Sequence, residues 1–440
     1  MFFRLFTCGS SSFMSSTPET ESFEAMDLSP KKRIQKKKAT PPAEDLVVKG
    51  MDLLPSEVTI DILSRLPITS LTLFKFTSSS GSALVADQRL PALFLNRIID
   101  TDPCLIMINP DSSASRQLYF VDSDGRGGYI NTARKFNPLK TVCGFDLVGC
   151  CHGLLCISIP KYYHSTQVHV LQICNPFVTI SNSLELPDPN RLVNQREIFG
   201  FGFHPRSREF KVIRIVFYEL IMTGRRERVT VHKSEVQVLT VGTTEWRKKG
   251  ASPYNFELKA PEALVEGSFH WAVPYFNYHH RVISFELAEE VFKEIPLPDC
   301  IEEYYSGYHL SELNRCLTVA GFCQGGRLDI WVMKEYNVKE SWEKEYCINH
   351  YVPLFFFFDG QNGMVNEDFA SNWMGRFVRV LSVLKNGEIV LECNKRALVS
   401  YDPKIDRFKA LKINRLPQQF QAFAFKPTLF SVKETIEMKV

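Results

Sequence analysis

The 440-residue sequence has no apolar run that could span a bilayer. A membrane-spanning helix needs about 20 predominantly apolar residues, and YVPLFFFF at 351–358 falls far short of that length. The N-terminus, MFFRLFTCGSSSFMSS, starts with a brief apolar segment but lacks the apolar core of roughly 7–15 residues found in secretory signals. Glu19, Glu21 and Glu24 argue against a transit peptide. We therefore expect no membrane partner.

The chain also has little excess charge and few cysteines for its length. Its formal net charge is +3, so it does not present the strongly basic balance typical of nucleic-acid-binding domains, and we expect no nucleic-acid partner. The twelve cysteines are scattered, without the density of a disulfide scaffold. We expect reduced thiols, and hence a protein of the nucleus, the cytoplasm or both.

Motifs for catalysis, metals and cofactors are weak. The densest reactive cluster consists of Cys143, Cys150, Cys151, His152 and Cys156. Thiols and an imidazole can bind zinc, but zinc knuckles use C-x₂₋₄-C pairs, and neighbouring side chains on a strand face opposite ways. The pattern favours cysteines of a strand core, with a metal-dependent or thiol enzyme as the alternative. No G-x-S-x-G nucleophile elbow occurs. We predict no catalytic residue, no metal and no cofactor.

The first fifty residues have the composition of a disordered tail. Residues 1–50 are rich in Ser, Thr, Pro, Glu and Lys and show no sustained hydrophobic period. Six of the eight residues 31–38 are Lys or Arg. Such a basic run is a nuclear-import signal, a nucleic-acid-binding patch or a solvated stretch of tail.

Residues 51–97 are the helical part of the chain. In LLPSEVTIDILSRLP, at 53–67, Pro55 suits the start of a helix and Pro67 stops it. Between the prolines, apolar side chains recur every four residues at Val58, Ile62 and Leu66, with Leu63 beside them, which predicts one apolar face. A helix this short is marginal in water unless that face is buried.

Two more short helices are expected after Pro67, around Leu71, Phe74 and the apolar residues near 84–94. Gly81 and the serines around it weaken the middle of this segment. A unit of about fifty residues with three short helices needs a partner surface or the following domain for stability.

From about residue 104 the pattern becomes that of β-structure, with short alternating runs divided by Gly, Pro, Asn and Asp. Five clusters of strands begin near residues 150, 199, 265, 315 and 378. A four-stranded sheet cannot bury both faces alone, whereas a ring of such sheets can. Residues 104–136 and 418–433 can supply a further sheet closed by both ends of the chain. We predict a mainly β protein with a propeller-like domain of about six blades at 104–433; a pair of β-sandwiches is the alternative.

Two sets of motifs resemble known families. LLPSEVTIDILSRLPITSLTLFKF, at 53–76, resembles an F-box. The later pieces GCCHGLLCIS, CNPF, FGFGFHP, FKVIRI, VEGSFHW, FKEIPLP and DIWVMKEYNVKESWEKEY resemble the F-box-associated interaction domain of plant F-box proteins, which is kelch-like or propeller-like. The resemblance covers about residues 51–430 and gives an F-box at 51–97.

The resemblance implies a non-catalytic substrate-recognition subunit of an SCF-type (Skp–cullin–F-box) ubiquitin ligase. Such a subunit binds a Skp-type adaptor, and through it a cullin, and its β-domain holds a target protein for ubiquitination and proteasomal degradation. Carried over position by position, the residues expected to contact the adaptor are Leu54, Pro55, Ile62, Leu63, Leu66, Pro67, Leu71 and Phe74.

The sequence departs from the F-box pattern in one segment. Family members usually continue with V-C-K-S-W-R, whereas this chain has Thr77-Ser78-Ser79-Ser80-Gly81-Ser82, with Gly81 at the tryptophan position. Losing a buried tryptophan weakens a core or an interface. The alternative function is therefore a protein-binding module outside any ligase that has lost adaptor binding.

Overall fold

The computed structural model describes residues 54–109, 117–125, 127–136, 144–163, 166–178, 183–188, 196–223, 228–256, 259–274, 280–323, 327–348 and 378–438. The expected tail at 1–50 with its basic run, Cys143 and the apolar run 351–358 lie outside these ranges. Within them, no helix combines the length and the apolar character that crossing a membrane requires.

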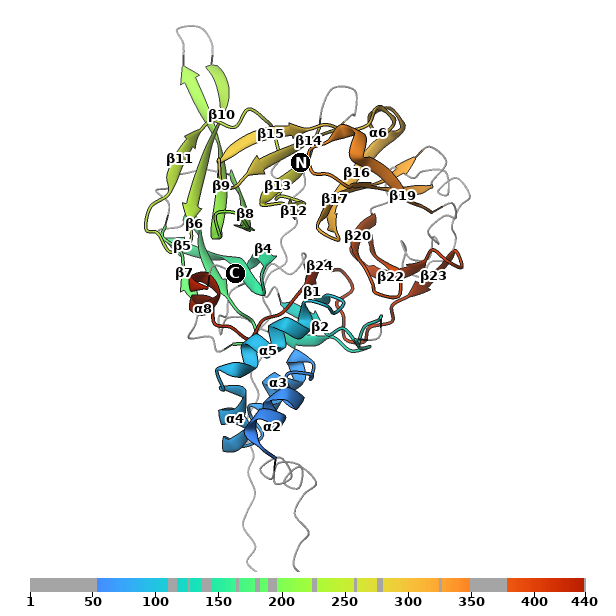
Figure 1. Cartoon of the computed structure of the whole chain (residues 1–440). Helices are drawn as coiled ribbons and strands as arrows, with labels where there is room; N and C mark the ends of the chain where they lie inside the picture. The colour runs from blue at the N-terminus through green and yellow to red at the C-terminus, as the bar shows by residue number, and fades with distance from the viewer. Residues whose placement is uncertain are drawn as a thin grey trace, which may run out of the picture. The chain divides into compact units, whose positions relative to one another are not determined.

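Residues 54–99, all of them described, contain four short helices, one more than expected (Figure 1). They are α2 (Ser56–Leu63), α3 (Ile68–Phe74), α4 (Ser79–Val85) and α5 (Arg89–Ile98). Pro55 and Pro67 are the residues that precede α2 and α3, and their carbonyls accept hydrogen bonds from Thr59 and Leu71. The prolines thus set where each helix starts, and α2 ends at Leu63, before Pro67.

The extra helix, α4, forms across the serine- and glycine-rich segment. The Ser78 side chain accepts a hydrogen bond of 2.9 Å from the Gly81 amide and caps the helix. A Cβ atom at Gly81 would lie 2.9 Å from the carbonyl oxygen of Phe74, at the end of α3. The glycine that weakens this helix by propensity is therefore what allows α4 to pack closely against α3.

The described strands form six four-stranded antiparallel sheets. One sheet contains β24 (Gln421–Phe425), β1 (Cys104–Ile108), β2 (Leu118–Val121) and β3 (Arg134–Phe136). The next contains β4 (Asp146–Cys151), β5 (Leu154–Tyr163), β6 (Thr166–Cys174) and β7 (Leu184–Glu185). The third contains β8 (Arg196–His204), β9 (Glu209–Thr223), β10 (Arg228–Thr240) and β11 (Arg247–Gly250).

The remaining three sheets follow in chain order. The fourth contains β12 (Ala263–Val265), β13 (Ser268–Pro274), β14 (His280–Glu286) and β15 (Val291–Ile295). Helix α6 (Asp299–Tyr304) precedes the fifth, which contains β16 (Tyr305–Leu313), β17 (Cys316–Cys323), β18 (Leu328–Met333) and β19 (Trp342–Ile348), with a 3₁₀ turn at Lys339–Ser341. The sixth contains β20 (Val378–Val383), β21 (Ile389–Cys393), β22 (Ala397–Asp402) and β23 (Arg407–Ala410).

The six sheets are the blades of a β-propeller (Figure 1), which confirms the predicted fold class and blade number. The inner strands β4, β8, β12, β16, β20 and β24 come from successive blades. Strands such as β1 and β21 are buried along their whole length, because a neighbouring blade covers each face of the sheet. This is why they read as continuous apolar runs in the sequence.

The ring is closed by strands from opposite ends of the chain, as predicted. β24 pairs antiparallel with β1, so that Phe425 faces Cys104 and Gln421 faces Ile108. Beyond β24, the chain crosses to the next blade and ends in α8 (Val432–Glu437). The buried Asn175 side chain donates to the carbonyls of Thr428 and Phe430, at 2.9 and 2.7 Å. Asn175 therefore fastens the C-terminal segment to the second blade.

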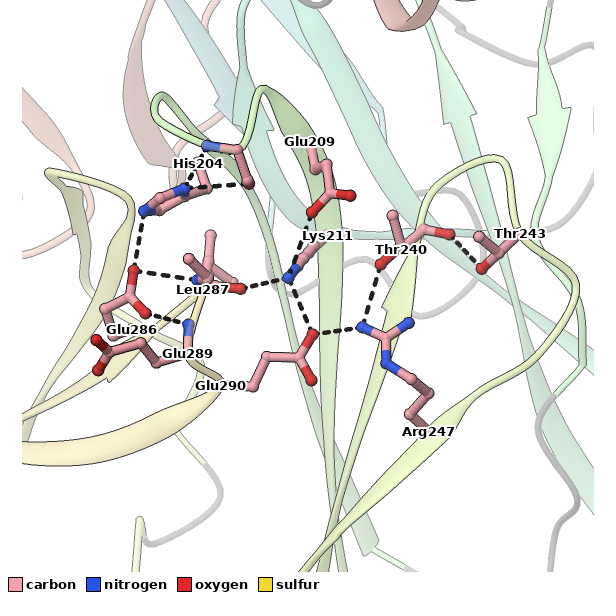
Figure 2. Close-up of polar contacts among 12 residues, drawn as sticks. His204, Glu209, Lys211, Thr240, Thr243, Arg247, Glu286, Leu287, Glu289 and Glu290 are labelled. Carbon is pink, nitrogen blue, oxygen red and sulfur yellow. Dashed lines mark hydrogen bonds and ion pairs between the residues drawn. The ribbon is translucent and has the colours of Figure 1, made fainter.

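A buried cluster of charges joins the third and fourth blades (Figure 2). Glu290 accepts hydrogen bonds from Lys211 at 2.9 Å and from Arg247, and it forms an ion pair of 2.6 Å with Lys249. Nearby, His204 contacts Glu286 at 2.9 Å. Burial alone would raise the pKa of Glu290, but the hydrogen bonds from the three cations outweigh it and lower the pKa to about 2.

Candidate functional site

Helices α2 and α3, with the residues that flank them, leave four large apolar side chains exposed. They are Leu54 (42% exposed), Val58 (45%), Leu73 (56%) and Phe76 (83%). Leu54 precedes α2 and Val58 lies in its first turn, while Leu73 lies in the last turn of α3 and Phe76 follows that helix. Apolar surface of this kind, on a unit that also has a filled core, is typical of a protein-docking face.

The opposite faces of the same helices are buried together with the propeller. Ile60, Leu63, Ile68, Leu71, Leu90 and Phe94 belong to one apolar cluster with residues of β1, β2, β4, β5 and β24. Figure 1 shows α2–α5 beside the blade that contains β1 and β2. The helices and the propeller share a core, which answers how so small a helical unit is stabilised.

A polar joint accompanies this shared core. The Thr69 hydroxyl, on α3, donates a hydrogen bond to the carboxylate of Asp122, which directly follows β2. The Arg134 guanidinium, from β3, donates to the Thr69 carbonyl oxygen at 3.3 Å. Burial raises the pKa of Asp122, although the Thr69 bond and the Arg134 charge oppose that rise. The joint fixes α3 against the first blade.

Charged side chains tie α2 to α5. Arg97 of α5 pairs with Asp61 of α2, which also binds Arg65 at 2.9 Å. Arg89 reaches Glu57 at 3.3 Å and Asp87 at 2.9 Å. These exposed pairs are each worth at most about 1 kcal/mol, so they orient the two helices more than they hold them together.

At the centre of the propeller, the inner strands surround a cavity of about 1420 Å³. The turns that follow β4, β8, β12, β16 and β20 line it, together with the segment after β24. Leu95, Ile98 and Ile99, at the end of α5, form part of its wall. The helical unit and the propeller therefore contribute to the same opening.

Comparison with known proteins decides the family. Residues 112–435 match the F-box associated beta propeller domain. The chain is 38% identical over 427 residues to F-box protein At3g07870 of Arabidopsis thaliana, an alignment that covers 91% of this chain and 98% of that protein. The chain belongs to the F-box proteins with an F-box-associated propeller.

Two further relatives from Arabidopsis thaliana are similar over much of the chain. F-box/kelch-repeat protein At3g23880 is 27% identical over 305 residues, which cover 66% of this chain and 78% of that protein. F-box protein CPR1 is 23% identical over 399 residues, which cover 84% of this chain and 87% of that protein. The resemblance deduced from the motifs is thereby confirmed, with helices α2–α5 in the position of the F-box.

The structure separates the residues predicted to contact an adaptor into three groups. Leu63 and Leu71 are completely buried in the shared core. Ile62, Leu66 and Phe74 are half-buried, and the side chains of Leu66 and Phe74 pack against that core. Leu54, Pro55 and Pro67 are exposed. The contact set stays a prediction, and within it the exposed and half-buried positions are the ones a partner can reach directly.

Four apolar positions outside the predicted contact set are exposed on the F-box: Val58, Leu73, Phe76 and Leu93. Val58 belonged to the four-residue period of α2 but faces solvent, while Ile60 and Leu63 face the core. Leu73 and Phe76 follow α3's buried pair, Ile68 and Leu71. The signal was present in the sequence: an apolar residue two positions after Leu71 lies on the far side of a helix.

The described cysteines of the sequence cluster lie in the core and in the wall of the central cavity. Cys156 on β5 is fully buried, and Cys150 and Cys151 end β4. Burial raises the pKa of Cys150 to about 12 and that of Cys151 well above its ordinary value, so neither is a thiolate at neutral pH. Across the described ranges, no three His, Cys, Asp or Glu side chains are grouped to hold a metal.

Proposed function

We propose that this F-box protein is the substrate-recognition subunit of an SCF-type ubiquitin ligase. In this role residues 51–97 bind a Skp-type adaptor, and through it a cullin, while the propeller at 104–433 holds a target protein. The subunit does no chemistry itself. It raises the effective concentration of target lysines near the conjugating enzyme, and the target is then ubiquitinated and degraded.

One observation carries the proposal: around α2 and α3 the F-box turns four large apolar side chains outward, while Ile60, Leu63, Ile68 and Leu71 of the same helices are buried with the propeller. Burying a large apolar side chain contributes about 1.5–3 kcal/mol. Leu54, Val58, Leu73 and Phe76 therefore offer a partner several kcal/mol of association free energy. Well-packed apolar anchors of this kind dominate most protein interfaces.

Direct binding to a purified Skp-type adaptor tests the proposal. We expect the full chain to bind, and Phe76→Asp combined with Val58→Asp to abolish binding, because both changes place a charge on the exposed apolar face. Ile405→Asp, at an exposed apolar position of the propeller, is the matched control and keeps wild-type binding. The proposal fails if the full chain does not bind, or if the double variant binds like wild type while all three proteins melt alike.

Gly81 favours a second candidate, a target-binding protein outside any ligase. This position carries no side chain, and α4 packs against the end of α3 where the F-box pattern has an aromatic residue. The two candidates differ in the fate of captured partners. A ligase subunit's partners accumulate when the proteasome is inhibited, whereas partners of a simple binding module keep their abundance.

A further inference from the structure

The central cavity has the size of a peptide site. Small-molecule pockets usually enclose about 300–1,000 Å³, and this cavity encloses about 1420 Å³. Its wall includes apolar side chains from the F-box helix α5, namely Leu95, Ile98 and Ile99, and Ile99 is exposed. An occupant of the cavity therefore contacts both the inner strands and the last F-box helix.

Glu312 places a carboxylate in this cavity. It lies near the end of the inner strand β16, and its side chain is exposed to the cavity while the protein surrounds it. Burial accordingly raises the pKa of Glu312; the charges of Arg315 and Lys426 oppose the rise, and Glu266 adds to it. Within the described ranges, no side chain forms an ion pair or hydrogen bond with the Glu312 carboxylate.

The influence of Glu312 extends across the ring. Its charge helps to raise the pKa of Cys150 on β4, after burial and against the effect of Arg379. The blades that contain β4 and β16 are opposite each other in a six-bladed ring. Glu312 and Cys150 thus line the cavity from opposite blades.

Two other charged groups of the cavity, Arg379 and Glu262, have partners in the wall. Arg379 donates to Glu392 at 2.8 Å and also to the Ala422 carbonyl. Glu262 accepts from the Leu310 amide at 2.9 Å. The Glu312 carboxylate accepts no such bond from the described residues and is exposed to the cavity, so a cation that enters can pair with it.

Basic side chains surround the mouth. Arg208, Arg315, Lys385 and Lys426 are exposed on the turns that line the cavity. Lys426 also donates a hydrogen bond of 2.6 Å to the Ile99 carbonyl. Because all four side chains are exposed, salt screens their repulsion of an entering cation. The same basic side chains attract acidic residues that flank such a cation in a bound peptide segment. Asp100 and Glu266 are exposed on the same rim, so basic side chains outnumber acidic ones there without excluding them.

We propose that the cavity binds an extended segment of the target protein whose lysine or arginine side chain enters the channel and pairs with Glu312, while an apolar neighbour packs on α5. This inference rests on the proposed function of the propeller as the target-binding part. Acidic residues next to the inserted side chain contact the basic rim. Target recognition then involves the F-box helix α5 as well as the propeller.

A random 12-residue phage-displayed peptide library, selected on the immobilised full chain, tests this site without a known target. We expect enriched peptides to share a lysine or arginine beside an apolar residue. Glu312→Gln should weaken their binding by roughly 10- to 100-fold, because a hydrogen-bonded charge pair is lost. Selection on Glu312→Lys should instead enrich aspartate or glutamate at that position. Ile99→Ser should weaken the same peptides more modestly.

Glu343→Lys is the matched control, since Glu343 is exposed on β19, the outermost strand of the same blade. This variant should select the same peptides as wild type. The proposal is overturned if no peptide is enriched, or if Glu312→Gln and Glu312→Lys bind the enriched peptides as tightly as wild type. The readout does not involve the adaptor. A chain that binds these peptides but no Skp-type adaptor would contradict the ligase function and leave the cavity site standing.

Discussion

The hydroxyl of Thr69 on F-box helix α3 donates a hydrogen bond to the carboxylate of Asp122, which follows strand β2 of the propeller. Both side chains are buried. Around this bond, apolar residues of the F-box and of the first two blades form one cluster. The F-box is thus built onto the propeller, and its exposed apolar face has a fixed orientation relative to the cavity.

The joint makes stability depend on pH through Asp122. Because its pKa is raised in the folded state, the free energy of unfolding is highest when this carboxyl is protonated and falls as pH rises from about 4 toward the folded pKa. Asp122→Asn keeps an acceptor for Thr69 and carries no charge. We expect the variant to be more stable than wild type at pH 7, with the difference vanishing below about pH 4. Thermal melts across this range measure it, and a difference that is constant with pH would contradict the expectation.

Two leucines on α3 should have opposite roles. Leu71 is buried and Leu73 is exposed. Leu71→Ala leaves a cavity in the shared core and should lower the free energy of unfolding by about 2–5 kcal/mol. Leu73→Ala should change it by no more than about 0.5 kcal/mol and still weaken adaptor binding. Urea denaturation and adaptor titration of the pair measure both effects; equal stability losses would contradict the orientation of α3.

Gly81 should resist replacement even by alanine. Alanine is favoured over glycine in helices by about 1 kcal/mol, but its Cβ would lie 2.9 Å from the Phe74 carbonyl oxygen. We expect Gly81→Ala to destabilise the protein by about 1–3 kcal/mol. Ser80→Ala, one residue earlier, is the control and should be neutral or slightly stabilising. A more stable Gly81→Ala protein would show that α3 and α4 are not closely packed.

Asn175 should control how firmly the ring is closed. Asn175→Ala leaves the carbonyls of Thr428 and Phe430 without their donor, at a cost of about 1–3 kcal/mol. The specific readout is faster amide hydrogen exchange in β24, which precedes residues 428–430, and in α8, which follows them. Asn386→Ala removes a comparable amide bond to the Gly127 carbonyl at an exposed site and should leave exchange in β24 unchanged.

Glu290 should be the most sensitive charge of the propeller. Replacement by glutamine leaves Lys211, Arg247 and Lys249 without a shared anion and should cost about 3–5 kcal/mol. In the wild type, this contribution is fully present above pH 4.5 and is lost as pH falls toward about 2, because the folded pKa is depressed. Glu289→Gln, at the exposed neighbour, should have no measurable effect on urea denaturation.

Local sequence signals predicted much of the fold. Pro55 marked the start of α2, and glycine-bounded apolar runs marked the strands. Pro67 was expected to stop the first helix, and in the structure it also precedes α3. Self-similarity of those runs indicated six blades, because a sheet that is apolar on both faces needs neighbours on both sides. The joining of residues 104–136 with the last strand also followed, since a ring must be closed by the two ends of its chain.

The sequence did not predict the features that depend on contacts between distant residues. Helix α4 was missed because propensity counts Gly81 as a cost, whereas its packing against Phe74 requires a glycine. Leu63 and Leu71 matched the F-box pattern, but the pattern does not say whether the propeller or a partner covers them. Periodicity gives the apolar face of a helix and leaves open what lies against it.

The sequence by itself determined the division into a helical and a β part, the blade number and the family, because these follow from patterns within a few dozen residues. Tertiary structure decided which apolar residues of the F-box remain exposed and how Glu312 enters the channel. It also decided that Thr69 meets Asp122. The physical reason is that burial and pairing depend on which distant segments come together, and the propeller brings residues hundreds of positions apart into contact.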